Sequence, residues 1–147
     1  MTLLRLRYLF FLMLVCASVQ AVADSQSFGE YTVHYIAVNS TFITPEIADQ
    51  YGIVRGKRNA FLNISVLHNN EDGSTTPVTA TVQGGKSNLM QQSSDIAFRE
   101  IREGKAIYYI GEFDFSNAEL LRFRLSVQPE AKGPQHELEW STQLYAD

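Results

Sequence analysis

Residues 106–115 read AIYYIGEFDF, and residues 120–128, shortly after them, read LLRFRLSVQ. In the second stretch Leu121, Phe123 and Leu125 alternate with arginines, so that apolar and charged side chains fall on opposite faces of an extended chain. A period of two residues is typical of a β-strand that has one face against a core and the other against water. The two stretches therefore predict two amphipathic β-strands.

The same alternation recurs through most of the chain after residue 28. Runs rich in Gly, Asn, Asp and Pro, which favour turns, separate the alternating segments. Among them, 69–73, 84–85 and 103–104 are predicted to close hairpins, and 129–134 is predicted to form a longer loop. Further strands are predicted at residues 31–38, 60–67, 78–83 and 137–144, with two shorter ones at 89–92 and 96–102.

The charges suggest how some strands pair. If the two opening stretches form a hairpin, Glu112 and Asp114 lie on its outer face beside Arg122 and Arg124. Opposite charges on neighbouring strands stabilise a register by tenths of a kcal/mol up to about 1 kcal/mol. Glu139, in the last predicted strand, is placed to flank the same arginines.

One short helix is predicted at residues 45–51. Thr44 is a favourable N-cap, Pro45 suits the first helical position, and Glu46 faces the positive end of the helix dipole. Gly52 then provides the left-handed residue that commonly ends a helix. Two turns of helix are too short to be stable alone, so we expect this helix to pack on a sheet.

These elements predict an all-β fold, an antiparallel immunoglobulin-like β-sandwich of about seven or eight strands with one short helix. A small β-barrel is the structural alternative, because the same alternation serves both architectures. Long helices do not alternate with the strands, which argues against a doubly wound α/β fold.

The first 23 residues differ from the rest. Two arginines near the start are followed by an uncharged, mainly apolar run at residues 8–19, and the small residues Ala21 and Ala23 come just before Asp24. This order is typical of a secretory signal peptide, and we predict cleavage after Ala23. The apolar run is shorter than the roughly 20 residues that span a bilayer, which favours the signal peptide. An uncleaved membrane anchor is the alternative.

We therefore predict two parts, a signal peptide at residues 1–23 and a single domain at residues 24–147, exported to the periplasm. The only cysteine, Cys16, lies in the first part, so the predicted domain has no disulfide and no thiol nucleophile. The formal net charge of −4 argues against binding to nucleic acid, which requires a basic face. We expect no stable membrane span in the mature form.

Several segments resemble a known family. They read YTVHY at 31–35, NSTF at 39–42, YGIVR at 51–55, NISV at 63–66 and REGKAIYYI at 102–110. Together they resemble the bacterial family of small exported proteins known as domain of unknown function 4426. The resemblance spans nearly the whole predicted domain and implies an exported single domain. It assigns no catalytic or ligand-binding residue.

The sequence carries none of the common motifs of nucleophilic, phosphate-binding or zinc-dependent enzymes. We therefore expect no enzymatic activity, no cofactor and no metal ligand set. Two alternatives stay open. One is a carrier of a small ligand or metal ion that uses His34, although His34, His68 and His136 are far apart in the sequence. The other is a hydrolase whose site has no recognisable motif.

The best candidate for a binding site combines short polar side chains with an aromatic one where the first long strand ends. In the alternative interpretation, these polar residues turn the chain and Phe42 fills the core. A second segment, before the next strand, adds positive charges. We predict a binding module that docks to a protein of the bacterial cell envelope, on a surface formed by Asn39, Ser40, Thr41, Phe42, Arg55 and Lys57.

Overall fold

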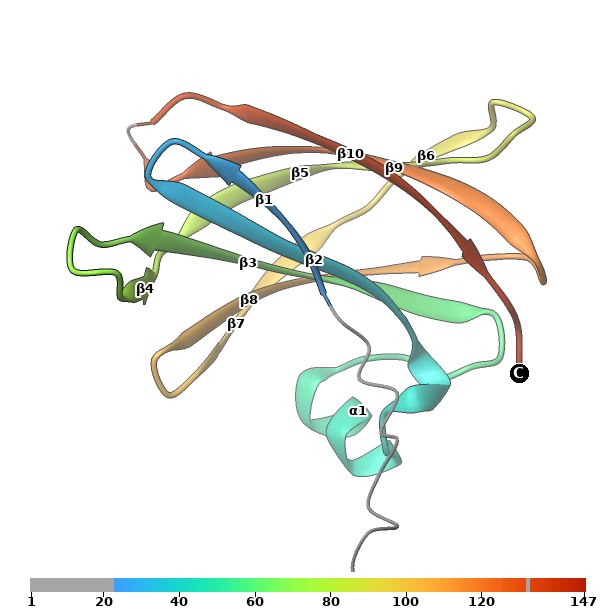
Figure 1. The fold of residues 1–147 in the computed structure, drawn as a ribbon. Helices are drawn as coiled ribbons and strands as arrows, with labels where there is room; N and C mark the ends of the chain where they lie inside the picture. The colour runs from blue at the N-terminus through green and yellow to red at the C-terminus, as the bar shows by residue number, and fades with distance from the viewer. Residues whose placement is uncertain (1–22, 132) are drawn as a thin grey trace, which may run out of the picture.

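The computed structural model describes residues 23–131 and 133–147, which form two antiparallel β-sheets packed face to face (Figure 1). The predicted signal peptide lies outside the described residues, apart from Ala23. The larger sheet contains β1 (Asp24–Phe28), β2 (Tyr31–Asn39), β3 (Asn59–Asn69), β4 (Thr75–Pro77), β7 (Phe98–Glu103) and β8 (Ala106–Asp114). The smaller sheet contains β5 (Ala80–Ser87), β6 (Ser93–Asp95), β9 (Glu119–Pro129) and β10 (His136–Leu144).

Strand order separates the two sheets clearly. The larger sheet runs β1-β2-β3-β8-β7, with β4 paired to β3, and the smaller runs β10-β9-β5-β6. Every pairing is antiparallel. The predicted all-β sandwich is therefore confirmed. No helix in the described part of the chain has the length and apolar character needed to cross a membrane.

The core lies between the two sheets and consists of the apolar positions predicted from the alternation. Phe123 is fully buried at its centre. A column of aromatic rings crosses the interface: Tyr35 lies 4.5 Å from Trp140, Trp140 lies 5.0 Å from Phe123, and Phe123 lies 5.1 Å from Phe113. Tyr35 and Phe113 come from the larger sheet, and Trp140 and Phe123 from the smaller one, so the column fixes one sheet against the other.

The short helix α1 (Pro45–Tyr51) follows a single 3₁₀ turn, η1 (Ser40–Phe42). As predicted, the Thr44 hydroxyl accepts a hydrogen bond from the Ile47 amide at 3.3 Å, and Gly52 ends the helix in the left-handed conformation. Both elements lie below the larger sheet in Figure 1.

Helix α1 covers part of the outer face of the larger sheet. Ala48 and Ile53, from the helix and the loop after it, are buried against Phe61 of β3 and Ile110 of β8. This small second core lies on the side of the sheet opposite to the main core, so the larger sheet is covered on both faces near the helix.

The predicted hairpin between β8 and β9 does not form. β8 pairs with β3 and β7, whereas β9 pairs with β10 and β5, and the chain crosses between the sheets at residues 115–118. Alternation identifies the inward face of each strand but not its neighbour, because both inward faces meet one core from opposite sides.

The predicted ion pairs change with this topology. Arg122 and Arg124 both contact Glu139, at 3.6 and 2.9 Å, as was expected for that residue. Glu112 instead lies 3.0 Å from Arg99 and accepts a hydrogen bond from the Val54 amide at 2.6 Å. Glu112 thus attaches the loop after α1 to the larger sheet.

Two further expectations were wrong in detail: residues 84–85 lie inside β5 instead of closing a hairpin, and residues 89–92 form the turn before β6. The short strands β1, β4 and β6 were not predicted. A Cβ atom on Gly84 would lie 2.1 Å from the Arg124 carbonyl oxygen, and one on Gly85 would lie 2.2 Å from that of Ser94. These glycines are therefore required by the close approach of neighbouring backbones.

The close approach at Gly84 predicts a large effect of one methyl group. Gly84→Ala is expected to lower the free energy of unfolding by about 3 kcal/mol, because the Cβ meets backbone that cannot move aside and the φ of +144° is unfavourable for alanine. Gly73→Ala is the control: its φ is also positive, but its Cβ would meet nothing within 4 Å, so about 1 kcal/mol is expected. Urea unfolding of both variants measures the difference. Equal losses of unfolding free energy would contradict the close approach of backbone at Gly84.

Candidate functional site

The six predicted site residues lie where β2 ends, at η1 and the loop before β3. Asn39 and Ser40 are buried, at 8% and 0% exposure. The Asn39 amide donates to the carbonyl oxygen of Tyr145 at 2.7 Å. The Ser40 hydroxyl donates to the Gly56 carbonyl at 3.1 Å and accepts from the Gly56 amide at 2.9 Å. These two side chains thus fix the backbone, as the structural interpretation expected.

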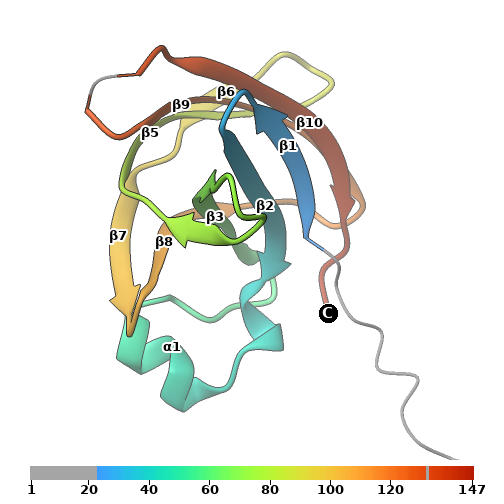
Figure 2. The same cartoon turned by 60° about the vertical axis from the view of Figure 1, so that its left-hand side comes forward.

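Thr41 and Arg55 add further hydrogen bonds to this region. The Thr41 hydroxyl donates to the carboxylate of Asp147, near the C-terminal end, which lies beside η1 in Figure 2. Arg55 donates through Nε to the Ile43 carbonyl at 2.9 Å and through Nη2 to the Thr41 carbonyl at 3.5 Å. Three segments that are distant in the sequence are thereby brought together.

Phe42 does not fill the core. Its exposed fraction is 73%, although its neighbours are held by hydrogen bonds. Val54, for which no sequence signal indicated a binding role, is 63% exposed, and Lys57 is exposed as well. We call the exposed side chains of Phe42, Val54, Arg55 and Lys57 the junction surface, and the buried residues beneath them its frame.

The charges around the junction surface are mixed. The helix carboxylate Glu46 accepts from its own backbone N–H and from the Thr44 hydroxyl, and these contacts, together with nearby Arg55, lower the pKa of Glu46. Glu46 therefore stays ionised at neutral pH and partly offsets the positive charge of Arg55 and Lys57. The surface thus combines two exposed apolar side chains, Phe42 and Val54, with charges of both signs.

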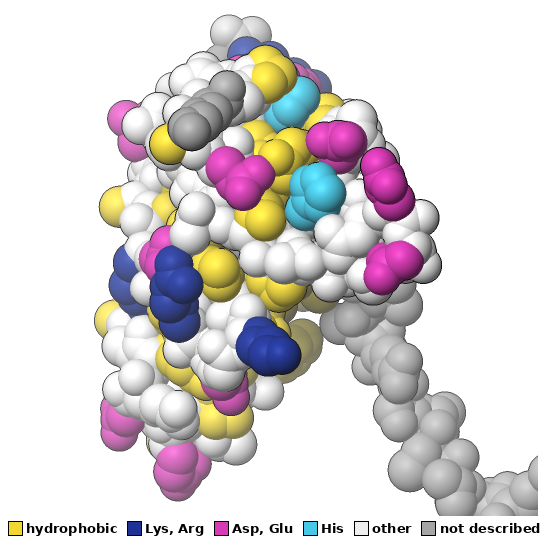
Figure 3. Space-filling model, turned by 90° about the vertical axis from the view of Figure 1, so that its left-hand side faces the viewer, with side chains coloured by type: hydrophobic (Ala, Val, Ile, Leu, Met, Phe, Trp, Pro, Cys, Tyr) yellow, Lys and Arg dark blue, Asp and Glu magenta, His cyan; other side chains and the backbone are white. Residues whose placement is uncertain are grey.

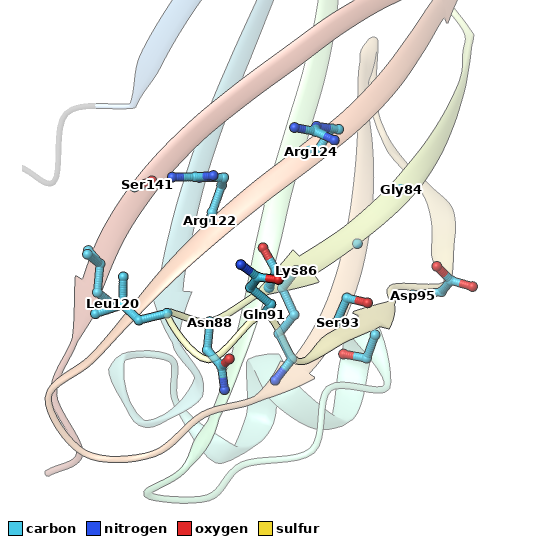
Figure 4. A pocket seen from close by; sticks show the side chains of 14 residues that line it. Gly84, Lys86, Asn88, Gln91, Ser93, Asp95, Leu120, Arg122, Arg124 and Ser141 are labelled. Carbon is cyan, nitrogen blue, oxygen red and sulfur yellow. The ribbon is translucent and has the colours of Figure 1, made fainter.

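A groove of about 570 Å³, separate from the junction surface, lies on the outer face of the smaller sheet. Figure 4 shows Arg122 and Arg124 projecting from β9 and Ser141 from β10, with Asn88 and Gln91 in the turn before β6. Both arginines share one carboxylate, Glu139, and both are largely exposed. The alternation predicted these side chains to point outward, but not that the β5–β6 hairpin would form a wall beside them.

The three histidines do not come together at one carrier site. His34 points away from the core between Ser25 and Ser65 of the neighbouring strands. The other two lie toward the β3–β4 end of the sandwich, where histidines lie close to acidic side chains (Figure 3). There, His68 is 3.7 Å from Glu30, and His136 stacks on Phe28.

Among residues 23–131 and 133–147, no three His, Cys, Asp or Glu side chains are grouped so that they hold a metal ion. The linings of three cavities in this part of the chain contain no histidine.

The sequence profile of a family described as a domain of unknown function, DUF4426, matches residues 25–147. The solved structure of a DUF4426 family protein from Pseudomonas aeruginosa PAO1 superimposes with a TM-score of 0.73 at 29% identity, over 85% of this chain and 96% of that one. None of the curated proteins compared with the chain matches it.

Two more distant structures share the fold. FetP from uropathogenic Escherichia coli strain F11, expressed in the periplasm of E. coli, has a TM-score of 0.61 at 9% identity, over 84% of this chain and 94% of that one. A copper-bound variant of P19 from Campylobacter jejuni has a TM-score of 0.51 at 9% identity, over 85% and 96%. At such identities the likeness concerns the fold alone.

Because Ser40 belongs to the frame and Phe42 to the surface, substitutions of these two residues are expected to change the free energy of unfolding by very different amounts. Ser40→Ala is expected to lower the free energy of unfolding by about 1–3 kcal/mol, because it leaves the Gly56 amide and carbonyl without their buried partner. Phe42→Ser is expected to change it by less than about 0.5 kcal/mol, because the ring is already in water. Chemical denaturation measures both, and a large loss for Phe42→Ser would show that the ring supports the fold.

Proposed function

We propose that the chain, which belongs to the DUF4426 family, is an exported, non-enzymatic module that docks to a protein of the bacterial cell envelope through the junction surface. The observation that carries the proposal is the 73% exposure of Phe42 on a backbone segment whose neighbours are held by buried hydrogen bonds. An aromatic ring in water on a fixed support is a typical anchor of a protein interface.

The frame makes such docking favourable. A partner that covers Phe42 and Val54 removes apolar surface from water, at about 25 cal/mol for each Å². Because the hydrogen bonds of Ser40 and Arg55 already fix the backbone, little conformational entropy is lost when a partner binds. The exposed apolar side chains supply affinity. Because the backbone beneath them is already fixed, little of that affinity is lost in ordering the chain.

The surrounding charges indicate the chemistry of the partner. Lys57 and Arg55 favour a partner with carboxylates opposite them, and Glu46 favours a cation at its own edge. Complementary charges of this kind mainly set orientation and association rate, while the buried apolar contact sets the lifetime of the complex. We therefore expect an apolar patch with an acidic edge on the partner.

Location in the envelope rests on two supports. The first 23 residues have the features of a signal peptide, and FetP, which shares the fold, was expressed in the periplasm of E. coli. Export places the junction surface where the exposed parts of envelope proteins are accessible. An uncleaved N-terminal anchor would place it in the same compartment.

Photo-crosslinking in living cells tests the proposal. A crosslinking amino acid at position 42 is expected to capture one defined envelope protein, whereas the same amino acid at position 89 is not. Leu89 is the matched control, because it is 78% exposed and lies in the turn before β6, outside the junction surface.

Charge reversal provides a second comparison in the same experiment. Lys57→Glu is expected to reduce capture at position 42 at least about fivefold, while Lys105→Glu, in the β7–β8 turn, leaves it unchanged. Equal capture at positions 42 and 89, or equal effects of the two reversals, would contradict docking through this surface.

A metal ion carrier is the second candidate, favoured by the copper-bound structures of FetP and P19 that share this fold. His34 is the residue predicted for this role, and its strand neighbours are serines, which are weak copper ligands. The docking proposal predicts the same low copper content in the wild-type protein and in His34→Ala, both purified from the periplasm and measured by mass spectrometry of the metal. One copper per chain that is lost in His34→Ala would favour the carrier instead.

A further inference from the structure

The groove on the outer face of the smaller sheet has room for a small ligand. Its volume of about 570 Å³ lies within the range of about 300–1,000 Å³ that is typical of ligand pockets. Strands β5, β6, β9 and β10 all contribute to its lining, together with the turn between β5 and β6 (Figure 4). We call this feature the sheet groove.

The strand register arranges side chains of the sheet groove in two rows that cross all four strands. In the first row, Arg122 of β9 lies between Ser141 of β10 and Ser87 of β5. Ser93 of β6 lies beyond Ser87. This row therefore presents one guanidinium and three hydroxyls, all of which can donate hydrogen bonds.

The second row places opposite charges on either side of a glycine. Arg124 of β9 lies between Glu139 of β10 and Gly85 of β5, and Asp95 of β6 lies beyond Gly85. Because neighbouring strands are about 4.7–4.9 Å apart, the backbones of Arg124 and Asp95 are about 10 Å apart in this row. Gly85 has no side chain, so the row leaves an open floor between a cation and an anion.

The two arginines share one carboxylate. Glu139 lies 3.6 Å from Nε of Arg122 and 2.9 Å from Nε of Arg124, and the two arginine side chains are 60% and 68% exposed. These contacts use the Nε atoms, so the Nη groups are accessible to another acceptor. Since one carboxylate bridges both guanidiniums, a second anionic group of similar size can bridge them too, and one negative charge does not neutralise two positive ones.

The third cation in the lining, Lys86, is already paired. Its Nζ atom lies 3.0 Å from the carboxylate of Asp114 and 5.6 Å from the centre of the Phe113 ring, and its side chain is only 14% exposed. The positive charge that a ligand can meet in the sheet groove therefore comes from the two arginines, and the negative charge opposite them comes from Asp95.

We propose that the sheet groove binds a small zwitterion that carries a phosphate group and, a few bonds away, an ammonium group. The phosphate lies between the guanidiniums of Arg122 and Arg124, near the Ser87 hydroxyl, and the ammonium group lies over Gly85 and faces Asp95. Phosphate suits this end better than carboxylate, because it has more oxygens to accept from two guanidiniums and a hydroxyl. The site shares no residue with the junction surface and does not depend on the proposed docking function.

Phosphoethanolamine and ethyl phosphate are suitable probes, because they differ chiefly in the ammonium group. NMR titration at constant ionic strength gives the dissociation constant of each probe. The backbone amides of residues 84–87 and 93–95 are expected to shift to saturation with both. Wild type is expected to prefer phosphoethanolamine about threefold, and Asp95→Asn is expected to abolish this preference, because the ammonium group then has no carboxylate opposite it.

A third probe identifies the source of the phosphate. Glycerophosphoethanolamine has the same ammonium group, but its phosphate is esterified on both sides, as in a lipid headgroup. Tighter binding of this diester than of phosphoethanolamine would assign the site to a headgroup, and weaker binding would assign it to a free phosphomonoester.

Two substitutions with opposite effects test the anionic end. Arg122→Gln is expected to weaken phosphoethanolamine at least about tenfold, because it removes a charge-assisted hydrogen bond. Glu139→Gln is expected to tighten it about threefold, because it removes the carboxylate that competes for both guanidiniums. Arg102→Gln is the matched control: Arg102 is 59% exposed and paired with a carboxylate, but it lies on β7 of the larger sheet, so no change is expected.

Equal weakening in Arg122→Gln and Arg102→Gln would overturn the proposal, because the probes would then respond only to the net charge of the protein. An unchanged preference for phosphoethanolamine in Asp95→Asn would overturn it as well. Amide shifts that do not saturate, or that lie outside the sheet groove, would have the same consequence. The four substituted side chains are all exposed, so the variants are expected to fold as the wild type does.

Discussion

The structure depends on contact between the inward faces of its two sheets, where Phe123 is fully buried and the rings of Tyr35, Trp140, Phe123 and Phe113 form a continuous column. This contact holds β2 and β3 in place, and their adjoining ends bring η1 and the loop before β3 together. Proteins of 9% identity share the fold, which is consistent with a scaffold set by alternation and burial more than by particular residues.

Beyond the core, polar side chains decide what the surface presents. Ser40 has no exposure, and it binds both backbone groups of Gly56, so it holds two segments together where the sandwich ends. Because the buried hydroxyl of Ser40 already joins these two segments, Phe42 is not needed to pack them together and its ring remains in water. Between α1 and the larger sheet, mainly apolar side chains and Asn63 line a small cleft.

Local signals in the sequence were sufficient for the parts of the fold that depend on neighbouring residues. The cap at Thr44, the stop at Gly52 and the inward face of β9 are encoded within a few positions. The strand that pairs with β9 is not encoded locally in this way, because Arg122 and Arg124 face outward equally well beside Glu112 or beside Glu139. Likewise, the predicted site residues do meet, but burial divides them into a frame at Asn39 and Ser40 and a surface at Phe42, and alternation carries no information about that division. The cleft at Asn63 needed the position of α1 on the sheet.

The central claim is that the junction surface is presented by a rigid frame. Hydrogen exchange of the Gly56 amide tests it directly, since this N–H is bonded to the buried hydroxyl of Ser40 at 2.9 Å. The account predicts that this amide, although it lies in a loop, exchanges about as slowly as amides in the middle of β3. Exchange as fast as that of the exposed turn at residues 71–73 would contradict it, because the backbone beneath Phe42 would then be open on the same timescale as an unsupported loop.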